Sequence, residues 1–242
     1  MTENTTPRVA VITGASSGIG AATARALHAA GYRVALLARR ADRISALAAE
    51  LGSGALPIQA DVTDREQLVA AAEHVQQELG GANVLVNNAG IMLLGPFASA
   101  QRDDYRNMID INLLGAITAT EVFHDQLLEA PGDVINLSSV AGRTARAGNG
   151  VYAATKWGLN GWSESLRQEL LPNVRVTLIE PGVVDTELPS HITHDATREA
   201  VLKGYSAATV KPEEIAAVIA FVLAQPRHLA INEILLRPAD QP

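Results

Sequence analysis

Two residues four positions apart, Tyr152 and Lys156, are the strongest candidates for chemistry in this chain. A predicted helix over Tyr152–Leu171 places both side chains on one face. A phenol has a pKa near 10 and is a poor acid or base at neutral pH, and we expect a nearby ammonium to lower that pKa by stabilising phenolate. Ser139 follows a predicted strand, and its hydroxyl could hold and polarise a carbonyl oxygen. Together these side chains indicate general acid–base chemistry at a carbonyl.

A glycine-rich run, Thr13-Gly14-Ala15-Ser16-Ser17-Gly18-Ile19-Gly20, follows a predicted strand and opens a predicted helix. Gly14 suits a tight turn, Gly18 lets the backbone approach a phosphate, and Gly20 allows close packing of helix on strand. The helix N-terminus would then face a pyrophosphate. The run predicts a dinucleotide site, and the alternative is an ordinary strand–helix turn.

The end of the second predicted strand bears on which nicotinamide cofactor would bind. An acidic residue usually stands there to bind a ribose 2′-hydroxyl, but this chain has Ala38 followed by Arg39 and Arg40. Guanidinium groups suit a 2′-phosphate through charge and a bidentate geometry. The pattern favours NADP(H), and the alternative is a solvated basic pair that opens the next helix.

Short β-type runs alternate with longer helical patterns along the whole chain. The predicted strands are Val9–Thr13, Val34–Ala38, Leu56–Gln59, Val84–Asn87, Val134–Leu137, Val174–Ile179 and Glu233–Leu236. The predicted helices include Gly20–Ala30, Asp42–Leu51, Asp64–Leu79, Asp103–Glu129 and Tyr152–Leu171. This alternation predicts an α/β fold of one Rossmann domain over residues 1–242, with a doubly wound parallel sheet of seven strands and helices on both faces.

Composition excludes several classes of protein. The chain has 242 residues, a net charge of −7 and no cysteine, with 48% hydrophobic and 19% charged residues. The charge argues against nucleic acid as a partner, and the missing cysteine excludes disulfides and thiolate metal sites. The apolar run Ile215–Ala224 is too short to span a bilayer and suits a buried helix. We therefore expect a cytoplasmic protein with no membrane partner.

The glycine-rich run Thr13–Gly20 resembles that of the short-chain dehydrogenase/reductase family, whose glycine-rich turn reads TGxxxGxG. The resemblance continues in order along the chain: the further matches are Asn87-Asn88-Ala89-Gly90, Asn112 in MIDINLLG, Ser139 in NLSSVAG, Tyr152-x-x-x-Lys156 and Pro181-Gly182. It implies a catalytic set of Asn112, Ser139, Tyr152 and Lys156. In that set Tyr152 is the proton donor, Lys156 also binds the nicotinamide ribose, and Asn112 helps carry a proton relay through water.

The resemblance also implies a set of contacts to NADP(H). It assigns Asp61-Val62 to the adenine, Asn88–Gly90 to the adenosine ribose, the Val184 backbone and the Thr186 hydroxyl to the carboxamide. Asp61 has an alternative role in the turn before a helix, and Thr186 could cap a short helix. The full expected cofactor set is Gly14, Ser16, Ser17, Gly18, Ile19, Gly20, Arg39, Arg40, Asp61, Val62, Asn88, Ala89, Gly90, Tyr152, Lys156, Pro181, Gly182, Val184 and Thr186.

The least regular region, residues 185–211, follows a predicted strand and is expected to form the substrate loop. It contains His191, His194 and Asp195, but the spacing is not that of a strong helical ligand pair and we expect no metal site. The Ile91–Pro96 stretch is expected to border the cofactor cleft, either as a substrate wall or as simple loop packing.

Three stretches outside the motifs resemble a narrower group of the family, the clavulanic acid dehydrogenases: NAGIMLLGP, PGVVDTELPSHITHDAT and EILLRPADQP. That group reduces an aldehyde with NADPH, so the resemblance implies an aldehyde or ketone reductase that acts on a small molecule, or the reverse reaction. The alternatives are a non-catalytic dinucleotide-binding sensor on the same fold and an oxidoreductase of imines or amino alcohols. Apolar residues beyond a sheet-facing stripe on the two long helices, together with the family's habit of pairing them, predict a homotetramer or a homodimer.

Overall fold

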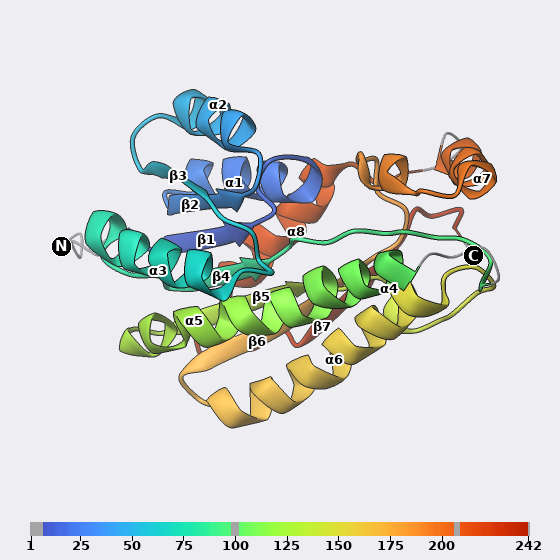
Figure 1. Ribbon diagram of the computed structural model, residues 1–242. Coiled ribbons are helices and arrows are strands. Elements are labelled where there is room, and N and C mark those ends of the chain that lie inside the picture. Colours follow the sequence, from blue (N-terminus) through green and yellow to red (C-terminus); the bar gives the residue numbers. More distant parts are fainter. Residues whose placement is uncertain (1–6, 98–101, 206–208, 242) are drawn as a thin grey trace.

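The structure is a computed structural model that describes residues 7–97, 102–205 and 209–241. Within these ranges seven strands form one parallel sheet in the order β3-β2-β1-β4-β5-β6-β7 (Figure 1). The strands are β1 Val9–Thr13, β2 Arg33–Ala38, β3 Ala55–Gln59, β4 Val84–Asn87, β5 Gly132–Leu137, β6 Val174–Pro181 and β7 Glu233–Leu236. The strand order reverses between β1 and β4, so the predicted doubly wound sheet is confirmed.

Helices cover both faces of this sheet (Figure 1). One face packs under α1, α2 and α8, and the other under α3, α5 and α6. The bounds of the helices are α1 Gly18–Ala29, α2 Ala41–Leu51, α3 Arg65–Leu79, α4 Arg102–Ile109, α5 Gly115–Glu129, α6 Gly150–Leu170, α7 Asp195–Tyr205 and α8 Pro212–Leu223. The central strands are buried on both faces, which explains their continuous runs of Val, Ile and Leu.

Two expectations from the sequence need correction. The predicted helix Asp103–Glu129 is interrupted by a π-helical turn, η2 Asp110–Leu114, between α4 and α5. The irregular region 185–211 contains the short 3₁₀ helix η4 Leu188–His191 and the eleven-residue helix α7. In the described part of the chain, no helix has the length and apolar character needed to cross a membrane.

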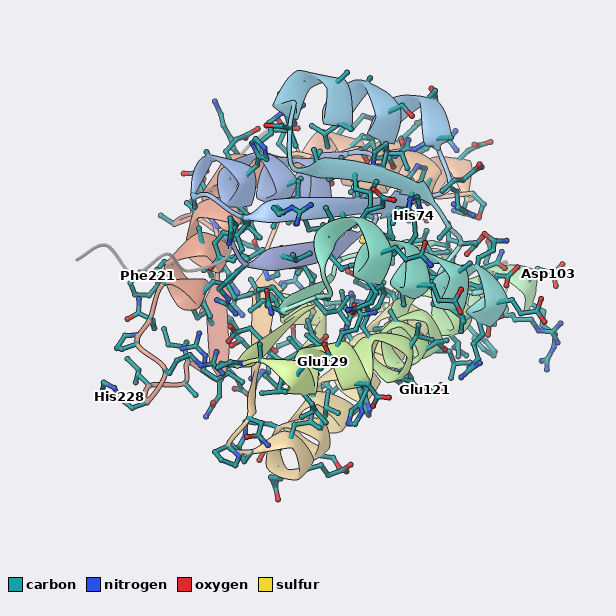
Figure 2. The ribbon with its side chains drawn as sticks, turned by 90° about the vertical axis from the view of Figure 1, so that its left-hand side faces the viewer. His74, Asp103, Glu121, Glu129, Phe221 and His228 are labelled. Carbon is teal, nitrogen blue, oxygen red and sulfur yellow. The ribbon has the colours of Figure 1, made fainter. Side chains whose placement is uncertain are left out.

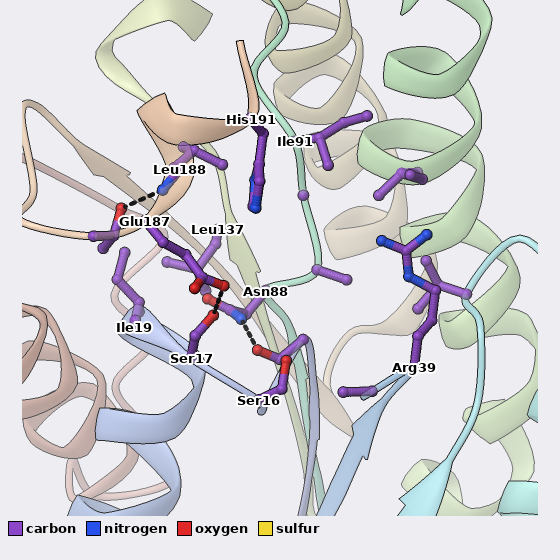
Figure 3. Close-up of a pocket in the computed structure, with 18 of the residues that line it drawn as sticks. Ser16, Ser17, Ile19, Arg39, Asn88, Ile91, Leu137, Glu187, Leu188 and His191 are labelled. Carbon is purple, nitrogen blue, oxygen red and sulfur yellow. Dashed lines mark hydrogen bonds between the residues drawn. The ribbon is translucent and has the colours of Figure 1, made fainter. Parts of the chain in front are cut away.

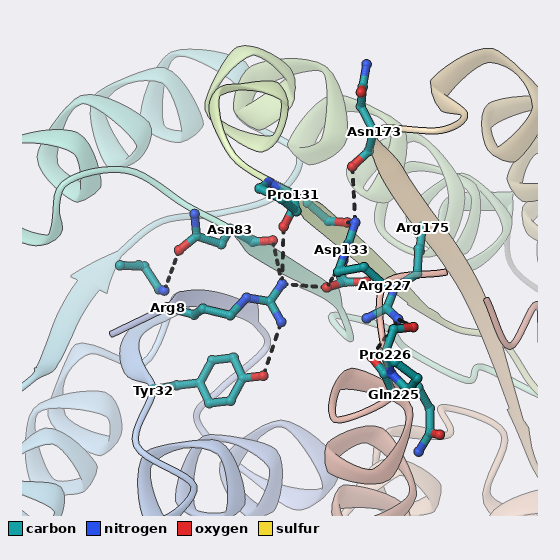
Figure 4. A network of polar contacts seen from close by, with 12 residues as sticks. Arg8, Tyr32, Asn83, Pro131, Asp133, Asn173, Arg175, Gln225, Pro226 and Arg227 are labelled. Atoms are coloured by element: carbon teal, nitrogen blue, oxygen red, sulfur yellow. Dashed lines mark hydrogen bonds and ion pairs between the residues drawn. The ribbon is translucent and has the colours of Figure 1, made fainter. Parts of the chain in front are cut away.

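A buried carboxylate, Asp133, organises the end of the sheet opposite the glycine-rich turn (Figure 4). Its oxygens accept from Arg8, from Arg175 Nε at 2.6 Å and from Arg227 Nη1 at 3.0 Å. These arginines come from the N-terminal segment before β1, from β6 and from the turn after α8. Asp133 therefore connects parts of the chain that are far apart in sequence.

Candidate active site

The turn after β1 has the backbone geometry that its glycines were expected to provide. Gly14 and Gly18 have φ angles of +66° and +51°, in the left-handed region that favours glycine. A Cβ atom at Gly14 would lie 2.9 Å from the Cα of Ala89, and one at Gly20 would lie 2.5 Å from the carbonyl oxygen of Gly14. The turn therefore leaves no room for a side chain at Gly14 or Gly20. The residues present thus fit a bound pyrophosphate at the start of α1.

The segment after β4 supports this turn from the neighbouring strand. Asn88 Nδ2 donates to the carbonyl oxygens of Thr13 and Gly14, at 2.9 and 3.3 Å. The backbone N–H groups of Asn88 and Ala89 donate to Thr13 Oγ1 at 3.0 and 3.1 Å. β1 and β4 lie side by side where the strand order reverses, which is where such sheets bind ligands. Asn88 thus has a positioning role beside its expected contact with the ribose.

Arg39 and Arg40 differ in where their side chains lie. The Arg40 guanidinium donates to the hydroxyls of Ser16 and Ser17, each at 2.8 Å, and pairs with Glu187. Arg39 extends into solvent, with Nη1 3.8 Å from Asp61 Oδ2. Both arginines line the same cleft, so both stay candidates for a 2′-phosphate. Both predicted arginines therefore already contact other residues of the chain, Arg40 through hydrogen bonds and an ion pair and Arg39 through the longer contact with Asp61.

The catalytic candidates meet at the carboxyl end of β5. Tyr152 and Lys156 lie in α6 and are both buried. Lys156 Nζ donates to the carbonyl oxygen of Leu137, the last residue of β5, at 2.7 Å. The same ammonium lies 5.8 Å from the centre of the Tyr152 ring. Ser139 follows β5, and its hydroxyl hydrogen-bonds the Tyr152 side chain.

The electrostatics of the pair differ from the expectation. Burial raises the pKa of Tyr152, and the hydrogen bond from Ser139 lowers it by a smaller amount. Burial also lowers the pKa of Lys156 to about 8. The expected fall in the Tyr152 pKa beside the ammonium is therefore wrong for this structure, because removal from water disfavours both charged forms. The phenol is held in its protonated form, ready to donate.

The π-helical turn directs Asn112 inward. Its Oδ1 accepts from the backbone N–H of Ile91 at 2.8 Å, and its Nδ2 donates to the Ile91 carbonyl oxygen at 2.9 Å and to Thr155 Oγ1 at 3.2 Å. Asn112 therefore joins the loop after β4 to α6 at Thr155, the residue just before Lys156. The water-mediated relay expected of it stays a prediction.

Two residues with alternative assignments serve in turns as well. Asp61 Oδ1 accepts from the backbone N–H and the hydroxyl of Thr63, at 3.0 and 2.8 Å, which closes the turn before α3. Thr186 Oγ1 accepts from the backbone N–H of Leu188 at 3.3 Å, at the start of η4. Asp61 and Thr186 also line the cleft, so a turn role and a binding role are compatible for each.

One cleft of about 320 Å³ brings most of these residues together. The expected cofactor residues that line it are Gly14, Ser16, Ser17, Gly18, Ile19, Arg39, Arg40, Asp61, Val62, Asn88, Ala89, Gly90, Tyr152, Lys156, Pro181 and Thr186. The expected cofactor and catalytic residues outside its lining are Gly20, Asn112, Ser139, Gly182 and Val184. Val184 forms an isolated bridge with Val210, and the contact of its backbone with the carboxamide stays a prediction. The phosphate end and the acid–base end thus share one cleft.

The sequence predicted that residues 185–211 form the substrate loop, but it singled out neither Glu187 nor Leu188 as a lining residue of the cleft. Glu187, Leu188 and His191 border the cleft, and Figure 3 shows His191 and Ile91 at the same end of it. Nothing in the sequence marked Glu187, because a carboxylate is the opposite of what a phosphate site predicts. His194 bonds Thr197 instead, and the described residues contain no group of three or more possible metal ligands. In the Ile91–Pro96 stretch Ile91 lines the cleft and neighbouring residues pack in the core, so loop packing is observed and the role as a substrate wall stays a prediction.

Comparison with known proteins places this geometry in context. The family model described as short chain dehydrogenase matches residues 8–197. An uncharacterized oxidoreductase of Staphylococcus saprophyticus is 35% identical over 98% of each chain. A solved serine dehydrogenase complexed with NADP+ has a TM-score of 0.90 and 32% identity, with coverage of 97% of this chain and 96% of its own. An alcohol dehydrogenase from Thermococcus sibiricus, complexed with 5-hydroxy-NADP, has a TM-score of 0.88 and 31% identity, with coverage of 97% and 98%.

Proposed function

The chain belongs to the short-chain dehydrogenase/reductase family, and from that premise we propose that it is an NADP(H)-dependent oxidoreductase that interconverts an aldehyde or ketone with its alcohol. The observation that carries the proposal is the meeting of Tyr152, Ser139 and Lys156 beside the cleft that also holds the glycine-rich turn. NADP(H) is supported by Arg39 and Arg40 after β2, and by the NADP ligands of the two neighbours just described.

The residues of the cleft divide the work of binding this cofactor. NADP(H), when bound, supplies or accepts a hydride at the nicotinamide. The turn from Gly14 to Gly20 would hold the pyrophosphate, and Arg39 with Arg40 would hold the 2′-phosphate. Lys156 would bind a ribose hydroxyl while it keeps its hydrogen bond to Leu137. The protein's part is therefore to orient the cofactor and to manage one proton.

In the reductive direction the chain's own residues stabilise a carbonyl oxygen as it gains negative charge. The Tyr152 hydroxyl donates its proton to that oxygen, and the Ser139 hydroxyl donates a hydrogen bond to it. The phenolate left behind is stabilised by the protonated Lys156 ammonium near the ring. Asn112 keeps its proposed place in a relay that returns a proton through water. Oxidation of an alcohol reverses each of these steps.

The proposed substrate class is an aldehyde or ketone. An aldehyde related to clavulanic aldehyde is one proposed substrate, and its support is the likeness of the three sequence stretches quoted above. The cleft adds Ile91, Leu188 and His191 on the side that a substrate would approach. These side chains suit a partly apolar carbonyl compound that carries a hydrogen-bond acceptor.

Turnover by the purified protein tests the proposed activity. Aldehydes, ketones, imines and hydroxy acids would be screened by the absorbance of NADPH, beside the Tyr152→Phe variant. We expect carbonyl reduction that falls by about 10²–10⁴-fold or more in the variant, while NADPH still binds. A variant that keeps more than about a tenth of the rate would show that the phenol is not the essential acid. NADPH binding without turnover of any compound would favour the sensor instead.

We also propose that the protein assembles as a homotetramer or homodimer with two-fold interfaces. Ile109 in α4, Leu114 in η2 and Trp157 in α6 are exposed, and Trp157 is 54% exposed. Phe221 projects from the outer side of α8 and is 56% exposed (Figure 2). Large exposed apolar side chains on these helices are consistent with surfaces that a second copy of the chain would cover. Light scattering at micromolar concentration should give at least a dimeric mass, and a monomeric mass would refute the proposal.

A further inference from the structure

We propose that the Glu187 carboxylate competes with a phosphate group of the dinucleotide for the basic end of the cleft, and so lowers the protein's affinity for its cofactor. Glu187 is the residue just before η4, and it reaches across the cleft to the other wall (Figure 3). The inference rests on the proposed NADP(H) cofactor and assigns a role to a residue that the motifs do not mark.

The contacts of Glu187 are those that a phosphate would make. Its Oε1 accepts from Ser17 Oγ at 2.6 Å and from Arg40 Nη2, and its Oε2 accepts from Arg43 Nη1 at 3.0 Å. Arg40 also donates to Ser16. Guanidinium and hydroxyl donors that converge on a pair of anionic oxygens are the usual partners of phosphate oxygens. The Glu187 carboxylate therefore uses two donors that the sequence assigns to the cofactor, Ser17 and Arg40.

The charges of this end of the cleft point the same way. Arg39, Arg40 and Arg43 bring positive charge, which Glu187 and Asp61 partly neutralise. A 2′-phosphate brings close to two negative charges at neutral pH, which exceeds the single positive charge that remains. With Glu187 neutral, the arginines and Asp61 would match that phosphate. The hydrogen bond from Arg40 is the largest cause that lowers the pKa of Glu187 to about 2, so the carboxylate is charged at any working pH.

The contact also connects the two ends of the cleft. Glu187 is followed directly by η4, which brings Leu188 and His191 to the substrate side. Its ion pairs fasten this segment to Arg40 and Arg43, which lie at the start of α2. A phosphate that takes over Arg40 would break that ion pair and leave the Glu187 carboxylate with Arg43. We therefore expect cofactor binding to loosen the anchor of the segment that borders the substrate.

The test compares nucleotide affinity in Glu187→Gln and in a matched control. Glutamine keeps the size of the Glu187 side chain and removes its charge. The control, Glu199→Gln, removes an exposed charge from α7, the helix that follows η4. Binding of NADPH and of NADH to the purified protein would be measured by fluorescence titration or calorimetry, without substrate. We expect NADPH to bind Glu187→Gln roughly tenfold more tightly, equivalent to about 1.4 kcal/mol, and Glu199→Gln to match the wild type.

The two nucleotides identify the phosphate concerned. A gain for NADPH alone assigns the competition to the 2′-phosphate, and an equal gain for both assigns it to the pyrophosphate, and either result supports the proposal. Unchanged or weaker NADPH binding in Glu187→Gln overturns it, and weaker binding would mean that Glu187 holds the cofactor in place. A wild-type protein that binds neither nucleotide overturns the proposed function as well.

Two further measurements guard against an indirect effect. In a double-mutant cycle, the gain from Glu187→Gln should shrink when Arg40 is already Gln, because the two residues act on one another. A gain that is unchanged in that background would contradict the proposed competition. Hydrogen exchange of residues 187–197 should quicken in Glu187→Gln without nucleotide. Equal exchange in the two proteins would refute the anchoring step.

Discussion

Replacing the buried Lys156 by Met should change how the stability of the protein depends on pH. The ammonium is enclosed between α6 and β5, and burial lowers its pKa from 10.5 to about 8. That difference corresponds to about 3 kcal/mol of folding free energy, lost whenever the lysine is charged. The hydrogen bond to the Leu137 carbonyl returns about 1 kcal/mol of this in the wild type. At pH 7 we therefore expect Lys156→Met to be more stable by about 1–2 kcal/mol.

The sign follows from proton binding in the folded and unfolded states. Between pH 8 and 10.5 the unfolded chain keeps the lysine protonated while the folded protein has released that proton. The free energy of unfolding of the wild type should therefore rise with pH through this interval. Below the interval, the full loss of folding free energy caused by the charged Lys156 should be present. About 1.6 kcal/mol of the rise falls between pH 8 and 9.5, because the lysine of the folded protein is still half protonated at pH 8. Burial raises the Tyr152 pKa, but both proteins keep that residue, so its effect largely cancels in the difference.

Urea unfolding of both proteins at several pH values from 6.5 to 9.5 measures this difference directly. Lys211→Met serves as a control, because Lys211 is exposed and its charge is not buried by folding. We expect the stability of the wild type relative to Lys156→Met to climb with pH, and relative to Lys211→Met to stay level. A Lys156→Met difference that stays flat from pH 7 to 9.5 would refute the claim that burial governs this ammonium.

Two other substitutions test the charged parts of the structure. We expect the wild type to prefer NADPH over NADH roughly tenfold, measured as a ratio of dissociation constants, and Arg39→Asp to abolish or reverse that preference. Equal binding of both nucleotides by the wild type would contradict the 2′-phosphate assignment. Asp133→Asn should lower the free energy of unfolding by about 3 kcal/mol, because it leaves the surrounding arginines without their carboxylate. A loss below about 1 kcal/mol in urea unfolding would show that backbone carbonyls alone satisfy those guanidiniums.

The strands and the glycine-rich turn were predictable because local patterns determine them. A central strand such as β1 needs an unbroken apolar run, and the bounds Val9–Thr13 are confirmed. The alternation of strands and helices then leaves few topologies, since parallel crossovers are right-handed. The turn at Gly14 and Gly18 was equally predictable, because a positive φ angle favours glycine.

The interruption of the long helix at η2 had no comparable signal. The run Asp103–Glu129 is compatible with one continuous helix, and a π-helical turn changes the register by a residue without a glycine or proline inside it. Its cause lies in tertiary contacts. Asn112 satisfies both backbone groups of Ile91, and a Cβ atom on Gly115 would lie 2.7 Å from Val62 Cγ2. Such contacts become visible only when the loop after β4 and the helix are placed together.

The same contrast between local and distant contacts separates the two ends of the cleft. Tyr152 and Lys156 share a helix, so their spacing alone predicts that they lie together. The position of Ser139 is predictable from the strand that it follows. Glu187 and Arg40 are 147 residues apart, and their ion pair depends on how η4 crosses the carboxyl edge of the sheet. Acid–base chemistry can therefore be inferred from short segments of this chain. Affinity for the cofactor depends on a balance of charges that the folded chain alone brings together, and Glu187→Gln alters that balance without touching the acid–base pair.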